Sequence, residues 1–347
     1  VLDAEHNFAH ASEQIRLAAS QGASLAVLPE YHLTGWVPDE PSFALSAEDG
    51  SRYQQRYRRL AAELHINICA GTVVSHAPES RKNGTNDAAP KKPTLLNTSY
   101  FIDHDGQLLG AYTKTNLWIP ERDHLTSSID YAHKMSVDEG TPAATGPHQV
   151  FDTPLGPVGI LVCWDLAFPE AFRQLVLAGA KIIIMPSYWT LSDMGREGLA
   201  YNANCERMFV ENALTTRAFE NTAALIYCNA TGPAEQGFFG CSQVALPIVG
   251  KVPGSFDDGE EGMRLVDVDM RVVEIAERNY QIRKDLKRVD WHYGGLTAIL
   301  MTAAAPGVDF LRFYVSHSED EVLVTKQHEA VNSSIFRQLP RGRGIVE

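Results

Sequence analysis

Residues 159–189 read GILVCWDLAFPEAFRQLVLAGAKIIIMPSYW, and this stretch decides the fold. Together with the residue before it, its first part forms an apolar run, Val158–Cys163, that predicts a buried strand. A helix is expected over Pro169–Leu177, because proline suits a first helical turn and Gly179 suits the position after a helix end. Lys181–Met185 predicts the next strand. Strand, helix and strand in alternation are typical of a layered α/β protein.

The same alternation continues on both sides of this stretch. Apolar residues at helical intervals predict helices over residues 5–20, 51–65 and 205–219. Apolar runs predict strands over residues 25–28, 66–74, 223–229, 242–247 and 265–269. Residues 95–102 and 107–112 flank Asp105-Gly106 and predict a hairpin. Long loops are expected at residues 75–94, 123–147 and 190–204.

Composition limits the partners and the compartment. The 347 residues carry a formal net charge of −13, so the surface would repel nucleic acid and anionic lipid. No apolar stretch reaches the roughly 18 residues of a membrane-spanning helix, and the first residues, Val1-Leu2-Asp3-Ala4-Glu5, do not have the basic-then-apolar pattern of a signal sequence. The five cysteines show no CxxC pair, which favours reduced thiols and a cytoplasmic location. The Asn-x-Ser/Thr triplets at Asn97 and Asn229 fall in predicted strands, where a glycan would not fit.

Three residues with chemical potential stand at the ends of different apolar runs. Cys163 ends one run just before a predicted helix start, a position suited to a nucleophile, although a buried structural thiol is the alternative. Glu30 follows the run at residues 25–28, and Lys114 follows the hairpin. Each signal is weak alone, but groups at strand ends converge in α/β sheets. A metal site is not expected, because the twelve histidines show no paired-ligand spacing.

The sequence resembles the nitrilase superfamily of carbon–nitrogen hydrolases. LAVLPEYHLTG (25–35), YTKTNLWIPER (112–122) and the stretch at 159–189 are similar to its glutamate, lysine and cysteine motifs, in that order, and TRAFENTAALIYCNATG (216–232) is similar to a later segment. The resemblance implies a four-layer α-β-β-α sandwich and a cofactor-free hydrolase that forms homodimers or larger homo-oligomers.

The resemblance also implies the roles of four residues. Glu30 would be the general base, Lys114 the oxyanion stabiliser and Cys163 the nucleophile, while Glu121 would brace the lysine and the attacking water. Residues close to these motifs in sequence are expected to line the substrate pocket: Trp164, Tyr188, Trp189 and Tyr31. Glu170 and Arg173 are expected to pair structurally on the helix after Cys163.

Residues 1–289 are expected to form the hydrolase domain and residues 290–347 a C-terminal extension that makes oligomer contacts through its apolar run, Phe310–Val315. The family's usual strand before the first helix is not evident here. The predicted reaction is hydrolysis of a carboxamide or N-carbamoyl compound through a Cys163 thioester, with release of ammonia. The alternatives are a nitrilase, a catalytically silent scaffold on the same fold and a metal-dependent amidohydrolase, the last disfavoured by the missing histidine clusters.

Overall fold

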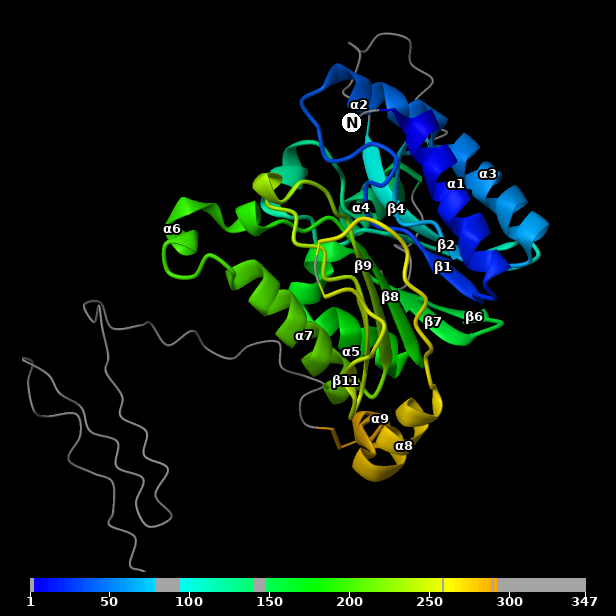
Figure 1. Ribbon diagram of the computed structural model, residues 1–347, viewed down its shortest axis with the longest axis vertical. Coiled ribbons are helices and arrows are strands. Elements are labelled where there is room, and N and C mark those ends of the chain that lie inside the picture. The colour runs from blue at the N-terminus through cyan, green and yellow to red at the C-terminus, as the bar shows by residue number, and fades with distance from the viewer. Residues whose placement is uncertain (1–2, 79–93, 140–147, 258, 289, 292–347) are drawn as a thin grey trace, which may run out of the picture. The chain divides into compact units, whose positions relative to one another are not determined.

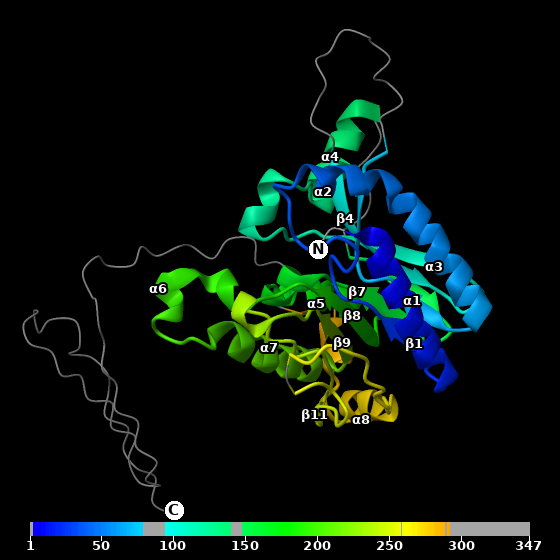
Figure 2. The same cartoon turned by 45° about the horizontal axis from the view of Figure 1, so that its top comes forward.

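The computed structural model describes residues 3–78, 94–139, 148–257, 259–288 and 290–291. The expected fold class is confirmed: two sheets lie face to face, with helices on the outer side of each (Figures 1 and 2). On one side lie α1 (Ala4–Ser20) and α3 (Gly50–Leu64). On the other lie α5 (Pro169–Leu177) and α7 (Cys205–Asn221). The result is an α-β-β-α sandwich.

The first sheet has the order β1-β2-β4-β3, with β5 also paired to β4. Its strands are β1 (Leu25–Val27), β2 (Asn67–Cys69), β3 (Val73–His76), β4 (Leu95–Ile102) and β5 (Leu108–Thr113). β1 runs parallel to β2, and the other pairs are antiparallel. The parallel pair places the carboxyl ends of β1 and β2 side by side, and Glu30 lies just past the first of these ends.

The second sheet has the order β11-β10-β9-β8-β7-β6. Its strands are β6 (Val150–Thr153), β7 (Gly156–Ile160), β8 (Ile182–Ser187), β9 (Ala224–Asn229), β10 (Gln243–Leu246) and β11 (Gly250–Lys251). β7, β8 and β9 are parallel, and β8 is buried along its whole length, as its isoleucine run predicts. One apolar core joins Phe101 and Tyr112 of the first sheet to Ile160 and Met185 of the second.

Other helices occupy the connections. They are α2 (Pro41–Ser46), α4 (Ser128–Glu139), α6 (Gly195–Leu199), α8 (Arg271–Tyr280), α9 (Ile282–Leu286) and the 3₁₀ turns η1 (Ala47–Asp49), η2 (Ile119–Asp123), η3 (Cys163–Ala167), η4 (Leu191–Met194) and η5 (Ala234–Gln236). The segments expected to be long loops at 123–147 and 190–204 therefore contain helices, and most of the loop expected at 75–94 lies outside the described residues. No helix in the described residues is long and apolar enough to cross a membrane.

Three expected elements are corrected by the structure. Residues 265–269 form no strand, because no neighbouring strand pairs with them in the described chain. The apolar residues of the alternating pattern, Val266 and Val268, pack against the core without strand pairing. The run at 66–74 is divided into β2 and β3 at Gly71, which adopts a left-handed φ of 59°. The strand before Cys163 ends at Ile160, so the cysteine lies in η3.

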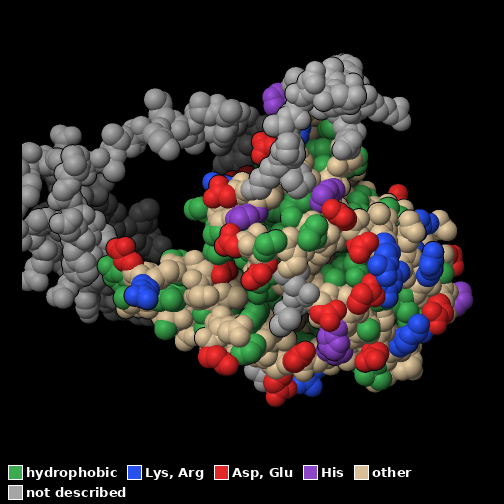
Figure 3. Space-filling view, turned by 90° about the horizontal axis from the view of Figure 1, so that it is seen from above, with side chains coloured by type: hydrophobic (Ala, Val, Ile, Leu, Met, Phe, Trp, Pro, Cys, Tyr) green, Lys and Arg blue, Asp and Glu red, His purple; other side chains and the backbone are tan. Residues whose placement is uncertain are grey.

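Charge is unevenly distributed over the described surface. Seen from above, acidic side chains spread over much of the visible face, whereas Lys and Arg gather on the side of α1 and α3 (Figure 3). Several arginines there are paired with carboxylates, among them Arg16 with Glu63 at 2.6 Å and Arg56 with Glu5 at 2.8 Å. The expectations for residues 290–347, including Phe310–Val315, lie almost wholly outside the described residues.

Candidate active site

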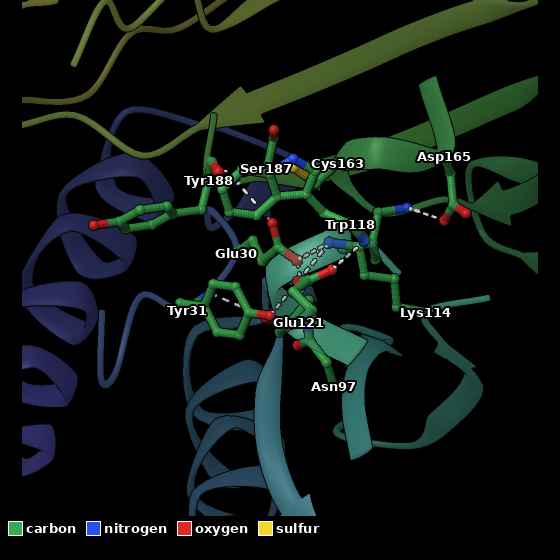
Figure 4. Close-up of polar contacts among 12 residues, drawn as sticks. Glu30, Tyr31, Asn97, Lys114, Trp118, Glu121, Cys163, Asp165, Ser187 and Tyr188 are labelled. Atoms are coloured by element: carbon green, nitrogen blue, oxygen red, sulfur yellow. Dashed lines mark hydrogen bonds and ion pairs between the residues drawn. The ribbon is translucent and has the colours of Figure 1, made fainter. Parts of the chain in front are cut away.

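Glu30 accepts hydrogen bonds from three elements. It follows β1 and is 1% exposed. Its Oε1 accepts 2.9 Å and 2.8 Å hydrogen bonds from Lys114 Nζ and Asn97 Nδ2, and its Oε2 accepts a 3.0 Å bond from the Tyr188 backbone N–H (Figure 4). The Glu30 N–H in turn donates to the Ser187 carbonyl at the end of β8. The carboxylate is thus held in one orientation where the two sheets meet.

Lys114 lies between two carboxylates. It follows β5, is 1% exposed, and donates a 2.7 Å hydrogen bond to Glu121 as well as the bond to Glu30. Glu121 lies in η2, where it also accepts a 2.7 Å bond from the Trp118 N–H and a bond from the Tyr31 hydroxyl. A buried ammonium needs such compensation, because an unpaired charge in the interior is strongly unfavourable.

Cys163 adopts a left-handed backbone conformation, with φ of 47°. This conformation is costly for a residue with a Cβ, and it persists where surrounding contacts impose it. Asp165 supplies those contacts: it accepts a 2.8 Å bond from the Val162 N–H, a 2.8 Å bond from the Tyr112 hydroxyl and a 3.1 Å bond from the Asn116 N–H. The thiol itself donates to the Tyr188 carbonyl across 3.7 Å. The resulting turn directs the sulfur toward Glu30 and Lys114.

Burial and charge determine the protonation of these groups. Burial raises the pKa of Glu30 to about 7, against the opposing effect of the Lys114 charge. Burial, reinforced by the Glu30 charge, also raises the pKa of the Cys163 thiol well above its ordinary value. Burial alone would lower the pKa of Lys114, but Glu121 and Glu30 outweigh that effect and raise it. Near neutral pH the site therefore holds a thiol, an ammonium group and a carboxylate that can accept a proton.

All eight residues predicted from the sequence line one cavity of about 450 Å³. They are Glu30, Tyr31, Lys114, Glu121, Cys163, Trp164, Tyr188 and Trp189. The structure adds residues that the sequence did not indicate, since Trp36, Trp118, Asp193, Glu206 and Phe238 also line the cavity. Asn97 was noted only for its Asn-Thr-Ser triplet, and both it and Asn229 are buried. No local signal marks Asn97 as a partner of Glu30, because the contact depends on how the strands are ordered.

Glu170 and Arg173 lie away from the cavity lining, but the pair expected between them is not formed. Arg173 Nη1 instead donates a 3.0 Å hydrogen bond to the Glu220 carbonyl on α7, and so joins α5 to α7. Within the described residues, no group of three or more His, Cys, Asp or Glu side chains is arranged to hold a metal ion.

Comparison with known proteins gives the chain's family. The model of the carbon–nitrogen hydrolase family matches residues 1–277. A probable nitrilase of Schizosaccharomyces pombe is 27% identical over 81% of this chain and 89% of its own, and an N-carbamoylputrescine amidase of Arabidopsis thaliana is 26% identical over 82% and 88%. A carbon–nitrogen hydrolase structure from Helicobacter pylori superposes with a TM-score of 0.65 at 20% identity, covering 86% of this chain and 95% of that one. This protein therefore belongs to the carbon–nitrogen hydrolase family and is a carbon–nitrogen hydrolase of the nitrilase superfamily.

Proposed function

We propose that this enzyme hydrolyses a carboxamide or N-carbamoyl compound through a thioester on Cys163, with release of ammonia. One observation carries the proposal: a thiol, a carboxylate with a pKa of about 7 and an ammonium group that donates hydrogen bonds to two carboxylates lie at one cavity. Thiol, base and oxyanion stabiliser are the groups that acyl transfer from nitrogen to sulfur requires. Curated relatives that include N-carbamoylputrescine amidases support the substrate class.

The first half of the reaction forms the thioester. The Glu30 carboxylate accepts the Cys163 proton as the sulfur attacks the carbonyl carbon, because the raised thiol pKa leaves little thiolate beforehand. Negative charge then develops on the carbonyl oxygen, and the Lys114 ammonium stabilises it. Glu30 returns its proton to the nitrogen, the C–N bond breaks, and ammonia leaves. The carbonyl carbon is now bonded to the Cys163 sulfur.

The second half regenerates the enzyme. Glu30 accepts a proton from a water molecule, whose oxygen attacks the thioester carbon. The C–S bond breaks as the second tetrahedral adduct collapses, the acid product leaves, and the sulfur recovers a proton from Glu30. Glu121 takes no proton in this scheme. Its hydrogen bonds from Lys114, Tyr31 and the Trp118 N–H keep the ammonium group in place between the steps.

Nitrile hydrolysis is the second candidate, because a nitrile carbon accepts the same attack. The Glu121-Arg122 pair is similar to the pair found after the lysine in nitrilases. Arg122, however, is outside the cavity lining, and its Nε donates a 3.3 Å hydrogen bond to the Leu117 carbonyl. The run Cys163-Trp164-Asp165…Phe168-Pro169-Glu170 is more similar to amidases and carbamoylases, and it favours the amide. Matched amides, N-carbamoyl compounds and nitriles assayed for released ammonia test the choice. We expect the larger kcat/KM for the amide or carbamoyl member of each set, and a consistent preference for the nitrile would reverse the assignment.

A catalytically silent scaffold is the alternative from another class. The three groups needed for chemistry are all present and oriented, which argues against it. We expect turnover to disappear in Cys163→Ala, because no thioester can form. Activity that survives in this variant would contradict the covalent mechanism, and the absence of ammonia release from every member of the panel in the unaltered enzyme would support the scaffold.

We also propose that the enzyme is at least a homodimer and acts in the cytoplasm. Exposed apolar side chains on α7 support the first point: Met208, Phe209 and Phe219 are 50%, 36% and 42% exposed. All five cysteines are free, which agrees with a reducing compartment. Light scattering at micromolar concentration should give a mass of at least twice 38.2 kDa, and a single 38.2 kDa species would refute the dimer.

A further inference from the structure

The cavity lining carries more negative than positive charge. It includes the carboxylates of Glu30, Glu121, Asp193 and Glu206, and Lys114 is its only cation among the described residues. Lys114 is already engaged by Glu30 and Glu121. Asp193 and Glu206, called here the acidic pair, thus have no cationic side chain in hydrogen-bond contact within the described chain.

Glu206 has one carboxylate oxygen available to a ligand. The residue lies in the first turn of α7 and is 7% exposed. Its Oε2 accepts a 2.7 Å hydrogen bond from Trp189 Nε1, whereas Oε1 has no hydrogen-bond partner among the described residues. The helix dipole favours a carboxylate in a first turn, but it does not require one that is buried beside a cavity. The carboxylate is therefore held in place through one oxygen, and its other oxygen can accept hydrogen bonds from a ligand.

Asp193 adds a second negative charge to the same cavity. Its carboxylate accepts a 3.2 Å bond from the Thr190 N–H and a 2.6 Å bond from the Thr190 hydroxyl, which fixes its position in η4. Burial raises the pKa of Glu206, and the charge of Asp193 contributes in the same direction. The two carboxylates thus repel each other, and a bound cation would relieve that repulsion.

The acidic pair is connected to the reacting groups by one short segment. Residues 187–193 begin beside Glu30, which accepts a bond from the Tyr188 N–H, and end at Asp193. Trp189, in the middle of the segment, holds Glu206 through its indole N–H. A substrate with its amide at Cys163 can therefore extend along this wall toward the acidic pair.

Aromatic rings form much of the same wall. Trp164 and Trp189 lie with ring centroids 5.5 Å apart, and Tyr188 and Phe238 are also 5.5 Å apart in an edge-to-face arrangement. All four line the cavity. Aromatic faces attract cations and cover the apolar part of a chain, whereas they offer nothing to an anionic group.

We propose that the acidic pair is a subsite for a positively charged group of the substrate. The preferred substrates are then amides or N-carbamoyl derivatives of compounds that carry an amine or guanidine group at the far end. This inference rests on the proposed function, because it assigns the substrate class of that same cavity. It makes Glu206 and Asp193 specificity-determining residues that take no part in bond breaking.

Three carboxamides of similar length test the proposal: 5-aminopentanamide, hexanamide and glutaramate, which end in an ammonium, a methyl and a carboxylate group. We expect kcat/KM for the ammonium compound to exceed that for hexanamide at least tenfold, with glutaramate the poorest. In Glu206→Gln the ratio of ammonium to methyl compound should fall at least tenfold, while the glutamine oxygen can still accept the Trp189 bond. Glu197→Gln, which removes an exposed charge on α6, is the matched control and should leave the ratio unchanged.

Binding measured without turnover separates the two proposals. Calorimetry on Cys163→Ala should show tighter binding of 5-aminopentanamide than of hexanamide, and the difference should shrink when Glu206→Gln is added. Equal affinity for the two amides, or a difference that Glu206→Gln leaves intact, would overturn the cationic subsite. Selective binding of the ammonium compound together with no hydrolysis of any amide by the unaltered enzyme would keep the subsite and reject the proposed function.

Discussion

Asn97 on β4 donates a 2.8 Å hydrogen bond to the Oε1 atom of Glu30, which lies past the end of β1. The two residues are separated by 67 positions in the sequence and by β2 in the sheet. A hydrogen bond donated to a carboxylate favours its charged form. Asn97 therefore opposes the effect of burial on Glu30 and helps to keep the base ionised near neutral pH.

Replacing Asn97 should change the pH dependence of the enzyme. Asn97→Leu preserves the volume but removes the donor, so the pKa of Glu30 should rise and the acidic limb of the kcat/KM profile should move to higher pH. If the pKa of Glu30 rises by about one unit, which corresponds to about 1.4 kcal/mol, the ionised fraction at pH 7 falls about fivefold, and we expect activity at pH 7 to fall by the same factor. A uniform loss of activity with the limb unmoved would show that Asn97 only supports the structure.

The pH profile of the unaltered enzyme should report Glu30. Because its pKa is raised to about 7, chiefly by burial, the base is protonated below that pH and cannot accept the thiol proton. We therefore expect kcat/KM to decrease as the pH is lowered through about 7, by about tenfold for each pH unit below that value. Glu30→Gln should lower kcat about 10²- to 10⁴-fold, because the general base is lost. Full activity at pH 5 would contradict the assignment.

Alkylation should identify the reactive thiol. Iodoacetamide is itself a small carboxamide, and we expect one equivalent to label Cys163 and abolish activity. Cys205 is partly exposed and competes with Cys163 for the reagent, so the labelled sites are counted in a Cys205→Ser variant. The rate of inactivation should fall below pH 7 together with activity, because Glu30 must accept the thiol proton. A chelator should leave the enzyme unaffected, and inactivation by labelling elsewhere would contradict the mechanism.

Gly71 should tolerate no side chain. It has φ of 59°, and a Cβ there would lie 2.2 Å from the carbonyl oxygen of Pro29, which precedes Glu30. Gly71→Ala should therefore lower the free energy of unfolding by more than the roughly 1–2 kcal/mol of left-handed strain, and it should also reduce kcat by displacing Glu30. Gly22→Ala is the control, since Gly22 also has a left-handed φ, of 85°, but a Cβ added there would meet no atom beyond its chain neighbours within 4 Å. Urea unfolding should show a smaller loss there, and equal losses would refute the steric argument.

Much of the fold was determined by patterns local in the sequence. Isoleucines at 182–184 predict the buried strand β8, and Pro169 with Gly179 delimits α5 closely, because strand and helix formation depend on a few neighbouring residues. The ends of apolar runs indicated Glu30, Lys114 and Cys163, and the resemblance added their roles and Glu121. The structure brings all four to one cavity. The segment at 265–269 shows the limit of such patterns: its alternation is real, but a strand needs a partner backbone.

The tertiary structure decided the rest. Asn97 meets Glu30 because β4 pairs with β2, and β2 pairs with β1. Glu206 lines the cavity because α7 packs across the second sheet and brings its first turn to Trp189. Neither carboxylate of the acidic pair differs in local sequence from an ordinary residue near a helix start. Which charges face a cavity depends on contacts between residues far apart in the chain, and sequence periodicity carries no information about those contacts.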